Sequence, residues 1–184
     1  MQMVTAAWTS QLVYVAAKLG IADLLQEGPR SAEQLALEVG VDPSALYRVL
    51  RALASISVFS EKGDGRFENT TLSDTLRSDA PGSKRALAEM FGEEHFLCWG
   101  DLLETVRTGR PAFDRLYHQP IFQFLTEHPE KGKLFDRAME SVHGEETDAM
   151  LDAYDFSAAG VVADVGGGNG SVLRKLLEIG RAHV

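Results

Sequence analysis

The sequence is poor in cysteine and in basic residues. Its single cysteine, Cys98, excludes an internal disulfide framework and a cysteine-based zinc cluster, and it fits a reducing compartment. Only 18 Lys and Arg stand against 27 Asp and Glu in the 184 residues, which gives a formal net charge of −9. A chain this acidic is a poor candidate for binding a phosphate backbone through its overall charge, so we expect no nucleic-acid partner.

Targeting and membrane-spanning segments are also absent from the sequence. Residues 1–8 contain no Lys or Arg, and the apolar stretch that follows is interrupted by Lys18 and Asp23. A signal peptide and a spanning helix are therefore excluded, and we expect a cytoplasmic protein without a membrane partner. The remaining composition is that of a globular protein, with 45% hydrophobic, 24% charged and 8% aromatic residues.

The first 55 residues predict three helices with clear boundaries. Apolar residues recur at helical spacing over Trp8–Leu19, and Gly20 is placed to end this helix. Its two apolar faces suit either a second subunit or the core of its own domain. A capping box from Ser31 to Gln34 starts a second helix, and Asp42-Pro43 supplies the N-cap and first residue of a third.

A β-hairpin is predicted next. Two short β-prone runs, Val58–Glu61 and Arg66–Glu68, flank a turn that contains Asp64-Gly65. A helix-turn-helix followed by a hairpin predicts a winged helix. Winged helices also occur in DNA-binding regulators, and that function is the alternative from another class. It is disfavoured because Arg48 and Arg51 are the only cations on the expected recognition helix.

Residues 81–156 predict helices only. One long helix is expected from Ser83 to about Thr108, with apolar side chains on two neighbouring stripes and burial on two sides. Gly109-Arg110-Pro111 breaks it. Further helices are expected over Ile121–Thr126 and from Pro129 up to Tyr154.

A glycine-rich loop near the C-terminus carries most of the chemical information. The apolar run Val161–Val165 is typical of a buried parallel strand, and helical spacing resumes over Ser171–Glu178. The connection between them fits D-x-G-x-G-x-G, starting at Asp164. Glycines allow a positive φ and close approach of a ligand, and the amides at the following helix N-terminus attract a carboxylate or phosphate. Such a turn can also exist for packing alone.

The spacing of this loop favours one cofactor. A dinucleotide fingerprint counted from Gly166 would need Gly or Ala at Ser171, and no Gly-Lys-Ser/Thr follows as in a Walker loop. After a strand that carries an acidic residue, the loop suits S-adenosylmethionine better.

Four stretches of the chain resemble the S-adenosylmethionine-dependent small-molecule O-methyltransferases that carry an N-terminal winged-helix dimerisation domain, the bacterial polyketide-tailoring branch above all. They are Lys18–Leu25, Leu46–Ser55, Thr105–Pro111 and Asp164–Gly170. The resemblance implies a mainly α chain: a winged-helix dimerisation domain (1–80), a helical linker (81–156) and the first β-α unit of a Rossmann-like domain (157–178).

The resemblance also implies site residues and partners. The methionine end of the cofactor is expected against Asp164, Gly166, Gly167, Gly168 and Gly170. Phe135 and Met139 are expected to wall the pocket of a small-molecule hydroxyl acceptor, although a Phe and a Met four residues apart also suit a helix core. A homodimer is implied, and no metal.

Departures from the family pattern lead to further expectations. The family's general-base histidine and ribose-binding acid lie beyond the glycine loop, so a truncated chain without a catalytic base is expected. The resemblance ends at Ile179, and our hypothesis is that residues 179–184 are a non-native tail that includes His183. The other four histidines show no ligand spacing and are predicted to be surface or packing residues: His95, His118, His128 and His143.

Two more expectations complete the prediction. Ser57 stands where the family usually has glycine, between the recognition helix and the wing, which predicts a strained turn there. A dimerisation module with no ligand of its own is a third functional alternative.

Overall fold

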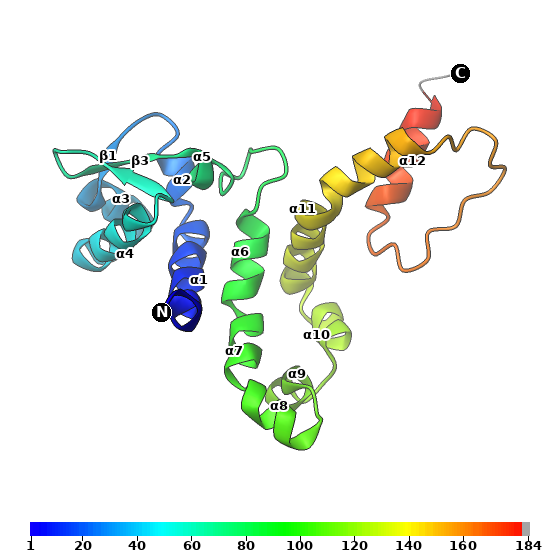
Figure 1. The fold of residues 1–184 in the computed structure, drawn as a ribbon, viewed down its shortest axis with the longest axis horizontal. Helices are drawn as coiled ribbons and strands as arrows, with labels where there is room; N and C mark the ends of the chain where they lie inside the picture. The colour runs from blue at the N-terminus through cyan, green and yellow to red at the C-terminus, as the bar shows by residue number, and fades with distance from the viewer. Residues whose placement is uncertain (182–184) are drawn as a thin grey trace.

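The computed structural model describes residues 1–181, apart from the side chains of residues 2, 143–145 and 179–181. The side chain of His143, residue His183 and the end of the predicted tail thus lie outside the described part. Figure 1 shows a small sheet with its helices at one end, then α1, α6 and α11 side by side, and then a long loop that returns to α12.

The N-terminal part has the predicted winged-helix order. Its antiparallel sheet has the strand order β1-β3-β2, with Ser31 opposite Arg66 and Ser60 opposite Glu68. The predicted hairpin is confirmed, whereas the sequence did not predict α2, β1 or α5. The elements here are α1 (Gln2–Lys18), α2 (Ile21–Leu24), β1 (Arg30–Ser31), α3 (Ala32–Val39), α4 (Pro43–Ser55), β2 (Phe59–Glu61), β3 (Arg66–Asn69) and α5 (Thr71–Asp74).

Local signals set the helix boundaries as predicted. Gln34 N donates to Ser31 Oγ at 3.3 Å while Ser31 N donates to Gln34 Oε1 at 2.9 Å, which completes the capping box. Ala45 N donates to Asp42 Oδ1 at 2.7 Å at the start of α4. Gly20 follows the end of α1 with φ 66°. Ser57 has φ 63°, so the strained turn is also confirmed.

The winged helix has its own core, because each of its helices buries one face against the sheet or a neighbouring helix. The side chains of Ile21, Leu35, Leu50 and Phe67 are fully buried there. A second, smaller cluster joins α6 to α11 through Met90, Leu134 and Ala138.

The prediction of one long helix from Ser83 to Thr108 is wrong, because the segment forms α6, α7 and α8 with breaks at Glu93 and Asp101. Gly92 lies so close to the Tyr14 ring that an added Cβ would collide with it. The next residue leaves helical geometry with φ −100° and ψ −118°. The bounds are α6 (Arg85–Gly92), α7 (Glu94–Gly100), α8 (Leu102–Thr108), α9 (Ala112–Tyr117), α10 (Ile121–Glu127) and α11 (Pro129–Ala153).

The expected burial of these helices on two sides is also wrong for the single chain. Trp99 is 64% exposed, Leu103 62% and Val106 73%. These three side chains form an apolar stripe of α7 and α8 that faces outwards in the single chain.

The prediction of a strand over Val161–Val165 is wrong as well. These residues form no strand, and Val161 and Val165 are 91% and 95% exposed. A parallel strand needs a neighbour for its hydrogen bonds, and no described segment pairs with this one. The helix that follows the glycine loop is present as α12 (Ser171–Arg181).

Candidate functional site

The glycine loop adopts the backbone conformation that its sequence requires. Gly166, Gly168 and Gly170 have φ values of 78°, 56° and 75°, in the left-handed region that residues with a Cβ rarely adopt. A Cβ added at any of the three would meet nothing within 4 Å. Backbone conformation, and not crowding by described residues, is therefore what requires glycine here.

Gly167 is required for a different reason. A Cβ at this position would collide with the carboxylate of Asp164. The Asp164 side chain thus folds over the loop, and a larger residue at position 167 would have to displace it. Asp164 consequently contacts its own loop, although residues 161–163 form no helix or strand and are exposed.

Hydrogen bonds fix the start of α12 and leave donors available in the loop. Gly170 N donates to the Gly167 carbonyl at 2.8 Å, and Ser171 N donates to Asn169 Oδ1 at 3.2 Å. The amides of Gly166 and Gly168 donate to no described residue. Free amides before a helix N-terminus form a site suited to a carboxylate.

Side-chain contacts hold this loop and α12 beside α11. Asn169 Nδ2 donates to Glu140 Oε1 at 2.6 Å, and Lys175 Nζ lies 2.6 Å from Asp148 Oδ1. Glu140 is the neighbour of Met139 in α11. The structure therefore brings the glycine loop close to the segment that carries the predicted acceptor residues, which the sequence could not show.

Phe135 and Met139 are both half-buried on α11. Met139 packs against the small cluster around Met90, and Phe135 makes an edge-to-face contact with Phe122 at a centroid separation of 6.1 Å. Both interpretations of the pair, pocket wall and helix core, are compatible with these contacts. Their role in binding an acceptor stays a prediction, as does the cofactor role of the glycine loop.

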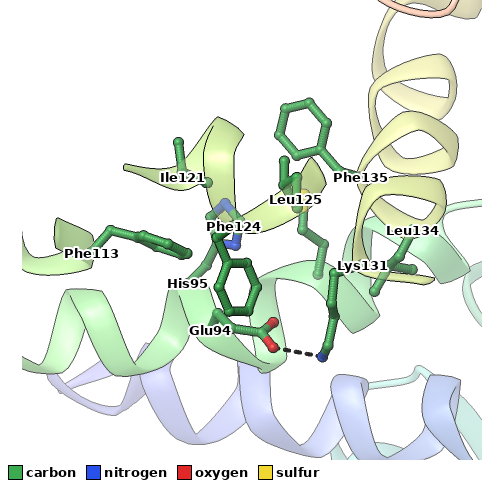
Figure 2. A pocket seen from close by; sticks show the side chains of 10 residues that line it. Glu94, His95, Phe113, Ile121, Phe124, Leu125, Lys131, Leu134 and Phe135 are labelled. Atoms are coloured by element: carbon green, nitrogen blue, oxygen red, sulfur yellow. Dashed lines mark ion pairs between the residues drawn. The ribbon is translucent and has the colours of Figure 1, made fainter. Parts of the chain in front are cut away.

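A small cavity lies next to Phe135. Figure 2 shows its side chains converging from α6, α7, α9, α10 and α11, with an ion pair between Glu94 and Lys131. That pair has a 2.6 Å separation. The cavity volume is about 20 Å³. Its lining residues are Met90, Glu94, His95, Phe113, Ile121, Phe124, Leu125, Lys131, Leu134 and Phe135.

His95 lines this cavity, and the sequence did not indicate that it would. The prediction of a packing or surface histidine is correct about its partial burial but missed its Nδ1, which is buried and has no hydrogen-bond partner among the described residues. Burial lowers the pKa of His95, despite the nearby Glu94 carboxylate and Met90 backbone. No spacing motif points to this residue, so only the tertiary structure could reveal it.

The described part of the chain offers neither a metal site nor a membrane-spanning helix. Among the side chains that the structure describes, no group of three or more His, Cys, Asp or Glu could hold a metal ion. None of the helices in that part of the chain combines the length and hydrophobicity that a membrane crossing requires.

Comparisons with known proteins identify the class of protein. Residues 1–79 match the O-methyltransferase dimerisation domain, and residues 99–179 match the O-methyltransferase domain. The chain therefore belongs to the O-methyltransferase family whose members join these two domains. Neither match supports a DNA-binding regulator, and the second extends beyond a stand-alone dimerisation module.

Individual relatives agree with this assignment. A phenazine O-methyltransferase of Lysobacter antibioticus, PhzM, is 43% identical over 177 residues, covering 96% of this chain and 52% of that protein. The crystal structure of LaPhzM matches with a TM-score of 0.91 and 43% identity, over 96% of this chain and 53% of that one.

A third relative was solved with ligands. The O-methyltransferase NcsB1 from neocarzinostatin biosynthesis, in complex with S-adenosylmethionine and 2-hydroxy-5-methyl naphthoic acid, matches with a TM-score of 0.79 and 32% identity. The match covers 92% of this chain and 53% of that one. The present chain thus spans about half the length of the relatives that it matches.

Proposed function

We propose that this chain is part of an enzyme that transfers a methyl group from S-adenosylmethionine to a hydroxyl of a small aromatic or polyketide-like molecule. The observation that carries the proposal is the left-handed conformation of Gly166, Gly168 and Gly170 behind Asp164, in a chain that belongs to the O-methyltransferase family. The cofactor seen in the NcsB1 complex supports the same choice.

The residues of the loop fit the methionine end of this cofactor. That end carries an ammonium and a carboxylate group. The exposed Asp164 carboxylate suits the ammonium, and the free amides of Gly166 and Gly168 suit the carboxylate. Gly167 and Gly170 keep the loop close to Asp164 and to the start of α12. When bound, S-adenosylmethionine supplies an electrophilic methyl group on a sulfonium.

The acceptor is assigned to the face of α11 that carries Phe135 and Met139. Their half-buried apolar side chains offer an aromatic ring a surface from which water is displaced. The hydrogen bond between Asn169 and Glu140, next to Met139, supports a short distance between cofactor and acceptor. Holding the two reactants in line lowers the entropic part of the barrier to transfer.

The assembly assigned to the enzyme is a homodimer in the cytoplasm, with a small-molecule acceptor as its other partner. The dimerisation-domain match supports the dimer. So do the exposed apolar side chains of Trp8 and Val106, which are 71% and 73% accessible in the single chain.

The test uses the full-length protein, because this chain spans about half the length of the relatives that it matches. Gly168→Val puts a β-branched residue at φ 56° and is expected to abolish S-adenosylmethionine binding in calorimetry. Gly160→Val is the matched control, since Gly160 precedes the loop, has no positive φ and has no close neighbour. A folded Gly168→Val protein with the affinity of the control would show that the loop is only a packing turn.

A further inference from the structure

Three buried side-chain atoms in the described part of the chain have no hydrogen-bond partner. They are His95 Nδ1, Thr105 Oγ1 and Arg115 Nε. Arg115 is already paired through its other nitrogens with Asp101. His95 is the one of the three that lines the cavity between the helices. A buried polar atom without a partner is costly, and a bound group that supplies the missing hydrogen bond removes that cost.

The size of the cavity limits what can reach His95. A volume of about 20 Å³ holds one water-sized group but not an aromatic ring. Seven of the lining side chains are apolar: Met90, Phe113, Ile121, Phe124, Leu125, Leu134 and Phe135. The cavity therefore fits a single polar substituent of a ligand whose ring stays outside.

Phe135 connects this cavity to the surface. It lines the cavity and at the same time contacts Phe122, which is 70% exposed. The two rings meet at 84°, so a flat molecule can stack on one of them and meet the edge of the other. A ring placed against this pair could direct one substituent inwards, to the cavity.

We propose that His95 is a specificity-determining residue whose Nδ1 hydrogen-bonds a hydroxyl group of a flat aromatic ligand held against Phe135 and Phe122. The identity of this ligand as the methyl acceptor rests on the proposed function; the binding site itself does not. The hydroxyl placed on His95 is a second substituent, which anchors the ring and does not receive the methyl group.

The chemistry of the site favours a neutral hydroxyl over a carboxylate. A hydroxyl can both donate and accept, so it can bond either tautomer of a neutral imidazole. Burial lowers the pKa of His95, which keeps the ring neutral at pH 7. The charged neighbours, Glu94 and Lys131, neutralise each other across 2.6 Å and leave no spare positive charge for a carboxylate.

The first test measures binding to the 184-residue chain, which contains every residue of the cavity. The probes are 2-naphthol and naphthalene, which differ by one hydroxyl. We expect 2-naphthol to bind about tenfold more tightly, as one added hydrogen bond to a buried unpaired group allows. It should also shift the ¹⁵N resonance of His95 Nδ1. Equal affinities, or an unmoved His95 resonance, would overturn the proposal.

Two substitutions separate recognition from packing. His95→Phe removes the unpaired atom, so it should raise the melting temperature while it reduces 2-naphthol binding to the level of naphthalene. His95→Asn keeps a polar atom near the Nδ1 position and should retain part of the preference, which provides a test even if the Phe variant misfolds. His118→Asn is the control, because His118 is exposed and outside the cavity.

Failure of the His95 site and failure of the proposed function give different results. If His95→Phe leaves the preference for 2-naphthol unchanged, the site is wrong whatever the enzyme does. If the Gly168→Val test fails while the probe preference holds, a binding site remains but its ligand is not a methyl acceptor. Cofactor affinity should be the same in all His95 variants of the full-length protein.

Discussion

Lys18 at the end of α1 and Glu93 at the break between α6 and α7 lie 75 positions apart, yet Lys18 Nζ donates a hydrogen bond of 2.6 Å to Glu93 Oε1. Lys131 in the first turn of α11 pairs with the other oxygen of the same carboxylate. The Glu93 side chain is only 11% exposed. One carboxylate therefore joins α1 to α11, the helix that carries Phe135 and Met139.

Replacing Glu93 by Gln should destabilise the fold. The amide keeps the shape but removes the charge that Lys18 and Lys131 share, so that Lys18 keeps Glu89 at 3.7 Å and Lys131 keeps Glu94. Charged hydrogen bonds of this kind are worth about 1.5–3 kcal/mol. Glu130→Gln, which removes the partner of Lys133 from a side chain that is 85% exposed, should have little effect. Urea unfolding at pH 7 measures the free energy of unfolding of both variants. Equal losses would show that the Glu93 cluster stabilises the fold no more than an exposed ion pair does.

The same cluster should make stability depend on acid pH. Burial alone would raise the pKa of Glu93, but hydrogen bonds and charges from Lys131 and Lys18 outweigh it and hold the pKa below its usual range. A lowered folded pKa adds stability above the ordinary carboxyl value, about pH 4.3, and this stability is lost as the pH falls through the folded value.

Unfolding free energies of wild type and Glu93→Gln, measured between pH 7 and pH 3, test this dependence. Their difference should be constant down to about pH 5 and shrink below it. A difference that grows towards acid would contradict the direction assigned to the pKa.

Ser57→Gly should stabilise the winged helix. Ser57 has φ 63°, and a left-handed residue with a Cβ costs about 1–2 kcal/mol relative to glycine. The backbone carbonyl of Ser57 that accepts from Thr70 Oγ1 is retained in the variant. Ser55→Gly, in the last turn of α4, should instead be destabilising. Thermal unfolding of the two variants should move the midpoint in opposite directions.

The outward apolar stripe of α7 and α8 predicts a dimer. Light scattering at micromolar concentration should give twice the chain mass for the wild type. Val106→Asp places a charge on the exposed stripe and should shift the protein to the monomer, because burying an unpaired carboxylate is unfavourable. Leu37→Asp, on an isolated exposed position of α3, is the control. A wild-type monomer would contradict the assignment.

The 184-residue chain by itself should bind S-adenosylmethionine very weakly and transfer no methyl group. Residues 161–165 have no strand partner among the described residues, and the glycine loop depends on that segment for its position. Amides after Tyr154 should exchange fast while those of the winged helix stay protected. A micromolar affinity for S-adenosylmethionine in calorimetry would show that the glycine loop of this chain already binds the cofactor.

Local sequence signals determined the helix boundaries and the glycine loop. The capping box at Ser31, the cap at Asp42 and the left-handed glycines of the loop act over a few residues, so their structure follows from the residues themselves. The strain at Ser57 could be predicted in the same way, from one residue in a turn that usually needs glycine.

The tertiary structure decided what depends on distant partners. The helical pattern around Glu93 does not reveal the break, at which Tyr14 packs against Gly92 and lysines of two other helices pair with Glu93. The apolar run Val161–Val165 is typical of a strand but remains unpaired, since pairing needs a neighbour that the described chain does not supply. The position of His95 in a cavity between helices likewise follows from packing between segments and not from its sequence neighbours.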